Sequence, residues 1–162
     1  MTQTNYTPLF DSNDVKIKSV EQVFDGFFKI NTFTFQHAKF AGGKSEWVQR
    51  EIFERGHAVG VLPYDPLLQK VVLVEQIRIG ALATKSSPWL LEVIAGMVDK
   101  EEESKESVAI REAQEEANLT ITSLTPMLSY LSSPGGTTER LYLYLAQVDT
   151  TDVGGIYGLD SE

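Results

Sequence analysis

The chain has 162 residues, of which 42% are hydrophobic and 23% charged, a composition typical of one globular domain with at most a small appendage. Its net charge of −9 and the absence of a Lys/Arg run argue against a nucleic-acid binder. The lack of cysteine excludes disulfides and thiolate metal sites and favours a reducing cytoplasm. No signal peptide or membrane-spanning run is evident, so we expect a cytoplasmic protein without a membrane partner.

The first third of the chain has the pattern of antiparallel strands. Residues 15–40 are rich in aromatic and β-branched side chains, and Thr and Phe alternate over residues 32–35 as in a half-buried strand. Residues 41–44, Ala-Gly-Gly-Lys, predict a turn. We therefore expect a small antiparallel sheet within residues 1–45, followed by a main domain at residues 46–162.

Two apolar runs rich in β-branched residues open the main domain. Residues 57–64, HAVGVLPY, and residues 70–80, KVVLVEQIRIG, are separated by a connection that contains Pro66. This arrangement predicts an antiparallel hairpin in the core. Residues 89–96, WLLEVIAG, then predict one short strand that ends at Gly96.

A helix is predicted over residues 104–118, SKESVAIREAQEEAN, which contain no Gly or Pro. Alanines recur at every fourth position of this segment, a narrow stripe that lets a helix lie close to a sheet. A loop at residues 132–136 leads to the alternating strand at residues 139–148. Strands before and after one helix favour an α+β or sandwich architecture. Residues 153–162 are Gly-rich, and we expect the natural protein to continue beyond them.

The predicted helix carries three glutamates on one face. Glu112, Glu115 and Glu116 are spaced i, i+3 and i+4, so their like charges repel by about 0.2–0.5 kcal/mol per pair. Such a run is most often a solvated face. It also suits a metal site, because Mg²⁺ prefers carboxylate oxygens and commonly takes one or two of them with substrate phosphates. The spacing alone leaves both interpretations open.

The surrounding residues resemble the Nudix box, whose pattern is Gly, five residues, Glu, seven residues, then Arg-Glu-apolar-any-Glu-Glu-any-Gly-apolar. Here Glu103 is followed by seven residues and then by Arg-Glu-Ala-Gln-Glu-Glu-Ala-Asn-Leu at residues 111–119. Six residues rather than five separate Gly96 from Glu103, and Asn118 stands in place of Gly. Asn tolerates left-handed backbone geometry, so a helix C-cap survives this change.

The resemblance implies the Nudix fold, an α/β/α sandwich with a mixed sheet, from which residues 46–162 would lack the C-terminal strand and helix. It implies hydrolysis of a nucleoside diphosphate derivative with Mg²⁺ or Mn²⁺, with more than one ion per site. The implied metal ligands are Glu112, Glu115, Glu116 and the carbonyl of Ala95, and Glu112 and Glu116 are also implied as catalytic residues. Gly96, Glu103 and Arg111 would orient the loop and the helix.

The resemblance extends from about Asp14 to the last residue and favours the ADP-ribose pyrophosphatase branch, which implies ADP-ribose as substrate and AMP and ribose 5-phosphate as products. It rests on the segments REIFERGHAV, VVLVEQIRIGA, PWLLEVIAGM and LSSPGGTTER. A proline follows the box by about fifteen residues in that branch, as Pro134 does here. The implied substrate-binding residues are Phe27, which would stack on adenine with Arg50 on the other face, and Arg78, Ser133, Pro134 and Glu139. Glu162 falls on the position that activates water.

Three alternatives remain beside this interpretation. Another nucleoside diphosphate derivative could be the substrate, or the chain could be a non-catalytic module that binds ADP-ribose. A simple cation binder is a third possibility, although the chain has no loop of the EF-hand kind.

Arg50 and Arg78 lie in apolar strands and could equally be structural arginines with an anionic partner. The resemblance also implies a homodimer that exchanges the N-terminal sheet between protomers, which would put residues such as Phe27 into the partner's site and make the dimer necessary for activity.

Overall fold

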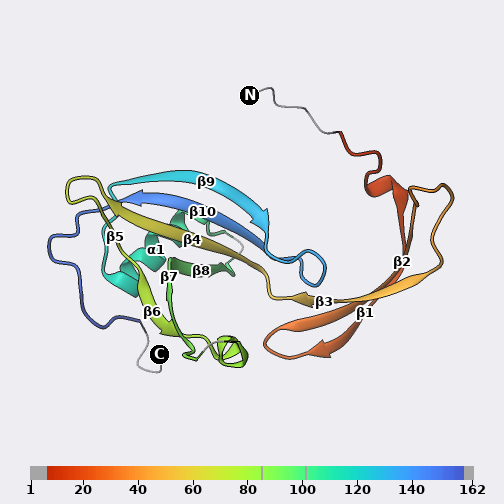
Figure 1. The fold of residues 1–162 in the computed structure, drawn as a ribbon, viewed down its shortest axis with the longest axis horizontal. Helices are drawn as coiled ribbons and strands as arrows, with labels where there is room; N and C mark the ends of the chain where they lie inside the picture. Colours follow the sequence, from red (N-terminus) through yellow and green to blue (C-terminus); the bar gives the residue numbers. More distant parts are fainter. Residues whose placement is uncertain (1–6, 85, 101, 159–162) are drawn as a thin grey trace. The chain divides into compact units, whose positions relative to one another are not determined.

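The fold was determined as a computed structural model that describes residues 7–84, 86–100 and 102–158. The chain divides into two compact units (Figure 1). The sheet unit comprises Met1–Arg55 and Ser133–Thr138, and the helix unit comprises Gly56–Ser132 and Glu139–Glu162.

The sheet unit contains the antiparallel sheet that the N-terminal pattern predicted. A short 3-10 helix, η1 (Ser12–Asp14), leads into three strands in the order β1-β2-β3. These strands are β1 (Val15–Asp25), β2 (Lys29–His37) and β3 (Val48–Glu54). The third strand lies beyond residue 45 because residues 48–54 pair in register with residues 29–35 of β2. The sheet unit therefore runs to Arg55, past the boundary expected from the turn at residues 41–44.

The helix unit is built on a mixed five-stranded sheet, as expected for an α+β fold. Its strands are β4 (His57–Asp65), β5 (Lys70–Val71), β8 (Ile94–Val98), β9 (Ser123–Leu131) and β10 (Arg140–Gln147). The order is β5-β4-β10-β9, and β8 also pairs with β4. β10 runs parallel to β4, and the other pairs are antiparallel. With neighbours on both sides, β4 is the central and most buried strand.

Two predicted elements differ from the structure. The predicted hairpin is short, because β4 and β5 pair only through Tyr64↔Val71 and Asp65↔Lys70. The chain then leaves the sheet, and β6 (Val74–Ile77) pairs with β7 (Trp89–Glu92) in a separate two-stranded sheet. The 3-10 helix η2 (Ile79–Ala83) lies between these two strands. Residues 89–96 were predicted as one strand, but they divide between β7 and β8, which belong to different sheets.

The edge strand β9 was not predicted, and its sequence explains why. Pro126 interrupts the strand, and proline cannot donate a hydrogen bond to a ladder. The pairing with β10 accordingly shifts register between Leu128 and Pro126. A bulge of this kind is tolerated because β9 lies at the edge of the sheet.

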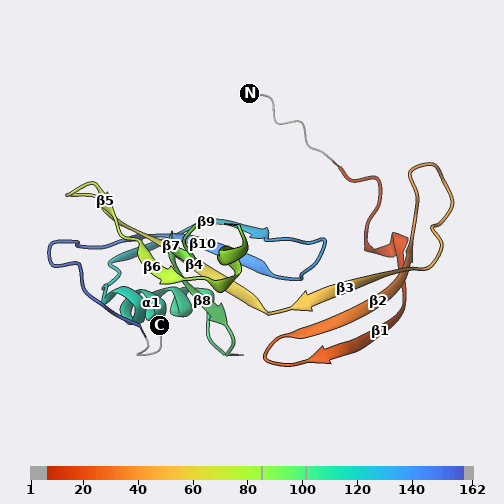
Figure 2. The same ribbon diagram turned by 60° about the horizontal axis from the view of Figure 1, so that its bottom comes forward.

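The predicted helix is α1 (Lys105–Ala117), and both of its ends have clear causes. The Ser104 Oγ accepts a hydrogen bond from the backbone N–H of Ser107 at 3.1 Å, which satisfies one free donor at the N-terminus. Asn118 adopts the left-handed conformation with φ 51°, as expected from the resemblance. The alanine stripe is buried, and α1 packs on β8 and β4 (Figure 2).

The core of the helix unit lies between α1 and the mixed sheet. Its buried side chains come from every layer: Val59, Val61, Ile94, Val108, Ala109, Ala113, Ala117, Leu119, Tyr144, Ala146 and Val148. The helix thereby fixes the position of its remaining, glutamate-bearing face relative to β8. In the parts of the chain that the structure describes, no helix is both long and apolar enough to cross a membrane.

Candidate active site

Arg111 is the hub of a network of three carboxylates. Its Nε lies 3.0 Å from Glu103 Oε1, and its Nη1 lies 2.7 Å from Glu112 Oε1 and 3.0 Å from Glu115 Oε2. These bonds raise the pKa of Arg111, and the bond from Arg111 lowers the pKa of Glu103. Arg111 therefore stays charged and ties the loop before α1 to the glutamate face of the helix.

Glu112 packs directly on Gly96. Its side chain is 13% exposed, and a Cβ on residue 96 would lie 2.0 Å from Glu112 Oε1. Only glycine leaves room for the carboxylate at this point, which gives the predicted Gly a physical reason. Burial raises the pKa of Glu112, and the neighbouring Arg111 opposes part of that rise. Burial thus disfavours the ionised form of Glu112, and a further cation beside the carboxylate would favour that form.

Glu116 lies beside the strand residue predicted to complete the metal site. The backbone N–H of Ala95 donates to Glu116 Oε2 at 3.2 Å, while Ala95 stands opposite Gly60 in the β4–β8 ladder. In an antiparallel ladder a residue exchanges both of its backbone hydrogen bonds with the facing residue, or neither. Because the N–H of Ala95 points away from β4 to Glu116, its carbonyl points to the same side. The structure thus brings this carbonyl and Glu116 to one edge of β8.

The donor set fits a hard divalent cation in its chemistry. Glu112, Glu115, Glu116 and the Ala95 carbonyl supply oxygen atoms, which Mg²⁺ and Mn²⁺ prefer. Within the described ranges, no three His, Cys, Asp or Glu side chains are gathered closely enough to form a ready metal cluster. Arg111 holds Glu112 and Glu115, and the Ala95 N–H holds Glu116. Coordination of one ion by these groups would therefore require the carboxylates to move closer together.

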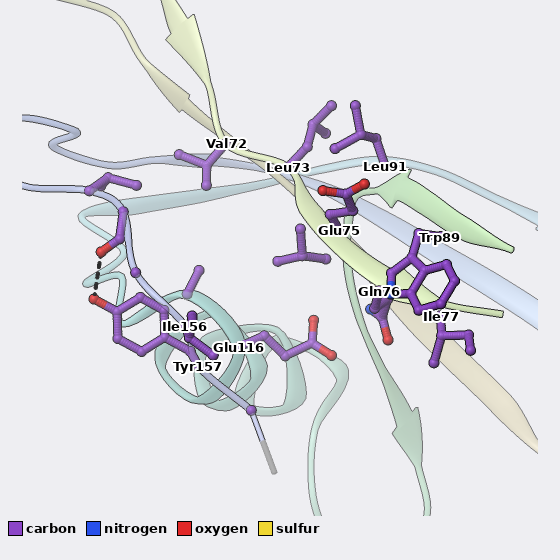
Figure 3. A pocket seen from close by; sticks show the side chains of 16 residues that line it. Val72, Leu73, Glu75, Gln76, Ile77, Trp89, Leu91, Glu116, Ile156 and Tyr157 are labelled. Carbon is purple, nitrogen blue, oxygen red and sulfur yellow. Dashed lines mark hydrogen bonds between the residues drawn. The ribbon is translucent and has the colours of Figure 1, made fainter. Parts of the chain in front are cut away.

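A cavity of about 540 Å³ lies beside Glu116 in the helix unit. One wall comes from β6 and β7 and includes Gln76, Ile77 and Trp89, and the opposite wall comes from residues 153–158. Figure 3 shows the Glu116 carboxylate extending from α1 towards Gln76. The cavity is thus apolar over much of its lining and carries one carboxylate of the candidate site.

Arg78 is held by an acidic partner that the sequence did not single out. Its Nε and Nη2 both lie 2.9 Å from Glu92 Oε2, which joins the residue after β6 to the end of β7. The side chain of Arg78 stays 45% exposed, so the guanidinium keeps access to a ligand. Opposite charges at the ends of two apolar segments, Arg78 in VEQIR and Glu92 in WLLE, are the sequence feature that could have revealed this pair.

The sheet unit does not bring Phe27 and Arg50 together within one chain. Phe27 is 88% exposed in the turn before β2, and its ring contacts the edge of Phe28 with centroids 4.7 Å apart. Arg50 lies further along the sheet, opposite Phe33, and donates to the Gln49 carbonyl. The arginine beside this aromatic cluster is instead Arg55, 5.6 Å from the Phe28 ring. Arg55 directly follows β3, and the β2–β3 register, which the sequence alone did not provide, places this end of β3 opposite Lys29.

The remaining predicted residues lie around the loop after β9. The Ser133 carbonyl accepts from Gly136 N–H at 2.9 Å and Thr137 N–H at 3.0 Å, which forms the expected turn around Pro134. In the helix unit, Glu139 is 7% exposed and accepts from Ser132 Oγ at 2.7 Å, so it links the end of β9 to the start of β10. Glu162, predicted to activate water, lies outside the described residues.

Comparison with known proteins gives one family and consistent relatives. A family model described as NUDIX domain matches residues 54–160. The chain is 50% identical to "ADP-ribose pyrophosphatase" of Escherichia coli (strain K12), covering 98% of this chain and 75% of that protein. It is 45% identical to "ADP-ribose pyrophosphatase" of Haemophilus influenzae, with coverages of 94% and 71%. It is 33% identical to "GDP-mannose pyrophosphatase" of Yersinia pestis (strain Pestoides F), with coverages of 82% and 67%.

A solved structure also matches the fold. The chain resembles "Crystal structure of ADP compounds hydrolase" with a TM-score of 0.65 and 20% sequence identity, covering 90% of this chain and 71% of that one. This likeness supports the mixed sheet and the small antiparallel sheet as parts of one known fold.

Proposed function

The chain belongs to the NUDIX domain family, and we propose that it hydrolyses the diphosphate of ADP-ribose to AMP and ribose 5-phosphate. The observation that carries this proposal is the high identity, along almost the whole chain, to proteins named ADP-ribose pyrophosphatase. That identity covers the sheet unit as well as the helix unit, whereas the family model begins at residue 54. The likeness to these proteins thus includes strands β1 and β2 of the N-terminal sheet, which lie outside the residues that the family model matches.

Glu112, Glu115, Glu116 and the Ala95 carbonyl are the residues that would hold Mg²⁺ or Mn²⁺, with more than one ion per site. Bound metal would neutralise the diphosphate charge and polarise its phosphoryl oxygens. The rise in the pKa of Glu112 through burial supports a cation at this position, because a second positive charge would favour the ionised form. Gly96 makes room for Glu112, and Glu103 acts through Arg111 to hold the helix face in place.

The other residues have roles in orienting the substrate and the water. Arg78, kept in place by Glu92, faces solvent with enough exposure to bind a phosphate oxygen. Phe27 offers an exposed ring for adenine, with Arg50 as the predicted cation on the other face of the base. Ser133, Pro134 and Glu139 would border the substrate at the loop after β9. Glu162 would take the proton of the attacking water.

A homodimer is part of the proposal, because Phe27 and Arg50 are separated within one chain. In a dimer with exchanged sheets, the two residues that flank one adenine would come from different protomers. The exposed apolar side chains of β1 support such an arrangement, since Val15, Ile17, Val20 and Val23 are each at least 44% exposed. The chain would act in the cytoplasm, as its lack of cysteine suggests.

A second candidate substrate is another nucleoside diphosphate sugar, and the 33% identity to a protein named GDP-mannose pyrophosphatase favours testing it. A non-catalytic module that binds ADP-ribose is less favoured, because every carboxylate of the box is present. The full chain should be incubated with Mg²⁺ and either ADP-ribose or GDP-mannose, and the products resolved by anion-exchange chromatography.

We expect AMP and ribose 5-phosphate from ADP-ribose, at a rate that exceeds GDP-mannose cleavage by about tenfold or more, equivalent to about 1.4 kcal/mol. Cleavage of GDP-mannose without release of AMP from ADP-ribose would show that ADP-ribose is not the substrate. Binding of ADP-ribose without cleavage of either compound would support the non-catalytic module instead.

A further inference from the structure

Asp65 is a buried carboxylate that the proposed chemistry does not use. It stands at the end of the central strand β4 and is 2% exposed. Its Oδ1 accepts from the N–H groups of Leu67 at 2.8 Å and Leu68 at 3.0 Å. Its Oδ2 accepts from Thr150 twice, from the backbone N–H at 2.9 Å and from Oγ1 at 2.8 Å. Two hydrogen bonds to each oxygen use the full acceptor capacity of the carboxylate.

Thr150 lies near the start of the segment that forms one wall of the cavity at Glu116. β10 ends at Gln147, and residues 149–158 follow without regular structure. Within this segment, Asp149 Oδ1 accepts from Thr151, and Tyr157 Oη donates to the Gly154 carbonyl. These bonds are local, whereas the two bonds from Thr150 to Asp65 connect the segment to β4. Residues 153–158 then line the cavity opposite Gln76 and Trp89 (Figure 3).

Few features of the segment between Thr150 and the cavity would keep it in place if the bonds to Asp65 were lost. Gly154 and Gly155 have φ of 144° and 136°, a region that residues with a side chain rarely adopt. Ile156 is 98% exposed, so little burial holds the segment down. Val148, which precedes the segment, is also held on β4 by its N–H to the Tyr64 carbonyl at 3.1 Å, and Thr150 carries this attachment into the segment towards the cavity wall.

We propose that Asp65 and Thr150 are positioning residues, which anchor residues 149–158 as a wall of the cavity beside Glu116 and so set the geometry for hydrolysis. This inference rests on the proposed function. Asp65 belongs to β4, which also pairs with Ala95 and Gly96 of β8. One strand thus aligns the metal-binding edge of β8 and the segment that faces Glu116. A small displacement of groups around a reacting substrate lowers turnover more than it lowers affinity, because orientation contributes to the barrier.

The test compares Thr150→Val with Thr122→Val in the full chain. Valine removes the Thr150 hydroxyl but keeps its shape and its backbone N–H. Thr122 is a matched control, because its Oγ1 donates to the Gln147 carbonyl at 3.0 Å and its loss leaves the bonds of Asp65 intact. Thr150→Ser keeps the hydroxyl and should restore the wild-type behaviour. Two readouts are needed: hydrogen exchange of residues 149–158, and kcat and KM for ADP-ribose with Mg²⁺.

For Thr150→Val we expect exchange in residues 149–158 to rise about tenfold, with kcat about tenfold lower and KM within about twofold of wild type. Thr122→Val and Thr150→Ser should match wild type in both readouts. Exchange in Thr150→Val equal to that in Thr122→Val, or faster exchange with unchanged kcat, would overturn the inference. If the wild-type chain does not cleave ADP-ribose, the proposed function fails, and the exchange measurement still decides whether Thr150 anchors the segment.

Discussion

The two units of this chain bury their apolar side chains very differently. The helix unit encloses a continuous core between α1 and the mixed sheet. Among residues 7–55 of the sheet unit, Thr34 alone is buried, while Ile17, Val20, Phe24 and Phe27 are each about half exposed or more. Both units have well-formed secondary structure, so local propensity does not separate them.

This difference indicates that the helix unit buries its apolar side chains within one chain, whereas the sheet unit needs a second surface to cover its own. Burial of apolar area is the main favourable term in folding, at about 25 cal/mol per Å². The helix unit gains this term internally and can hold Glu112, with its raised pKa, at a candidate metal site. A three-stranded sheet with exposed apolar faces gains little of it unless another surface covers those faces. The comparison predicts that changes in the two units will have different consequences.

The largest effect is expected from Glu112→Gln in the helix unit. Loss of one proposed metal ligand should lower kcat by about 100-fold or more, equivalent to about 3 kcal/mol of transition-state stabilisation. The melting temperature without metal should stay the same or rise, because burial disfavours the charged form that glutamine removes. Activity assays and thermal melts in EDTA provide the check. Full activity, or a large fall in melting temperature, would contradict the assignment of Glu112.

The next effect concerns the sheet unit and its expected partner. Val20→Asp places a charge on the 49% exposed Val20 of β1. If a second protomer covers this position, the buried charge should weaken the dimer by about 3 kcal/mol, or about 100-fold in Kd. Light scattering across a concentration series would show monomers, with activity falling in parallel.

Ser19→Asp is the control for that experiment, since it adds the same charge on the opposite face of the same strand. It should leave both the mass and the activity unchanged. A wild-type monomer with full activity would end the dimer proposal, and the sheet unit would then need another explanation for its exposed apolar side chains.

A smaller effect is expected from Arg111→Lys in the network on α1. A lysine cannot bond to Glu103, Glu112 and Glu115 at once, because it lacks the guanidinium fork. We expect a loss of about 1–2 kcal/mol after allowance for solvent screening, or a few degrees in melting temperature. Glu115→Gln, which neutralises the most exposed partner, should change stability much less. Equal melting temperatures for Arg111→Lys and wild type would show that the network does not hold the helix face.

The smallest effect is a dependence on pH that belongs to Asp65. Hydrogen bonds from Leu68, Thr150 and Leu67 lower the pKa of Asp65 to about 2, from an ordinary value of 3.8. The ionised form therefore stabilises the folded state above about pH 4, and this contribution is lost as pH falls from about 4 to about 2. Urea unfolding followed by tryptophan fluorescence should show a shallower pH dependence in this window for Asp65→Asn. An unchanged slope would contradict the ionised, fully bonded state of Asp65.

Much of the helix unit could be predicted from the sequence because its determinants are local. The box spacing, the alanine stripe and the tolerance of Asn118 for left-handed geometry all lie within residues 96–119. These features need no knowledge of the rest of the fold. The contact of Glu112 with Gly96 was not predicted, because it depends on how α1 packs against β8.

The features that could not be predicted depend on pairings between distant segments. Residues 89–96 divide because β7 pairs with β6 in one sheet and β8 pairs with β4 in another. An apolar run alone does not show where the chain passes from one sheet to the next. The Arg78–Glu92 pair and the bond from Thr150 to Asp65 join residues that are 14 and 85 positions apart. Arg55, rather than Arg50, lies beside Phe28 because of the β2–β3 register, which hydrophobic pattern alone left undetermined.

The most direct test of the central claim is calorimetric titration of the full chain with Mn²⁺. The claim is that the glutamates on α1 hold the metal required for hydrolysis. Wild type should bind Mn²⁺, and Glu116→Gln should weaken binding by about tenfold or more, about 1.4 kcal/mol or above. Glu102→Gln removes the same charge from the exposed loop before α1 and should bind as wild type does. Equal Mn²⁺ affinity in wild type and Glu116→Gln would contradict the account.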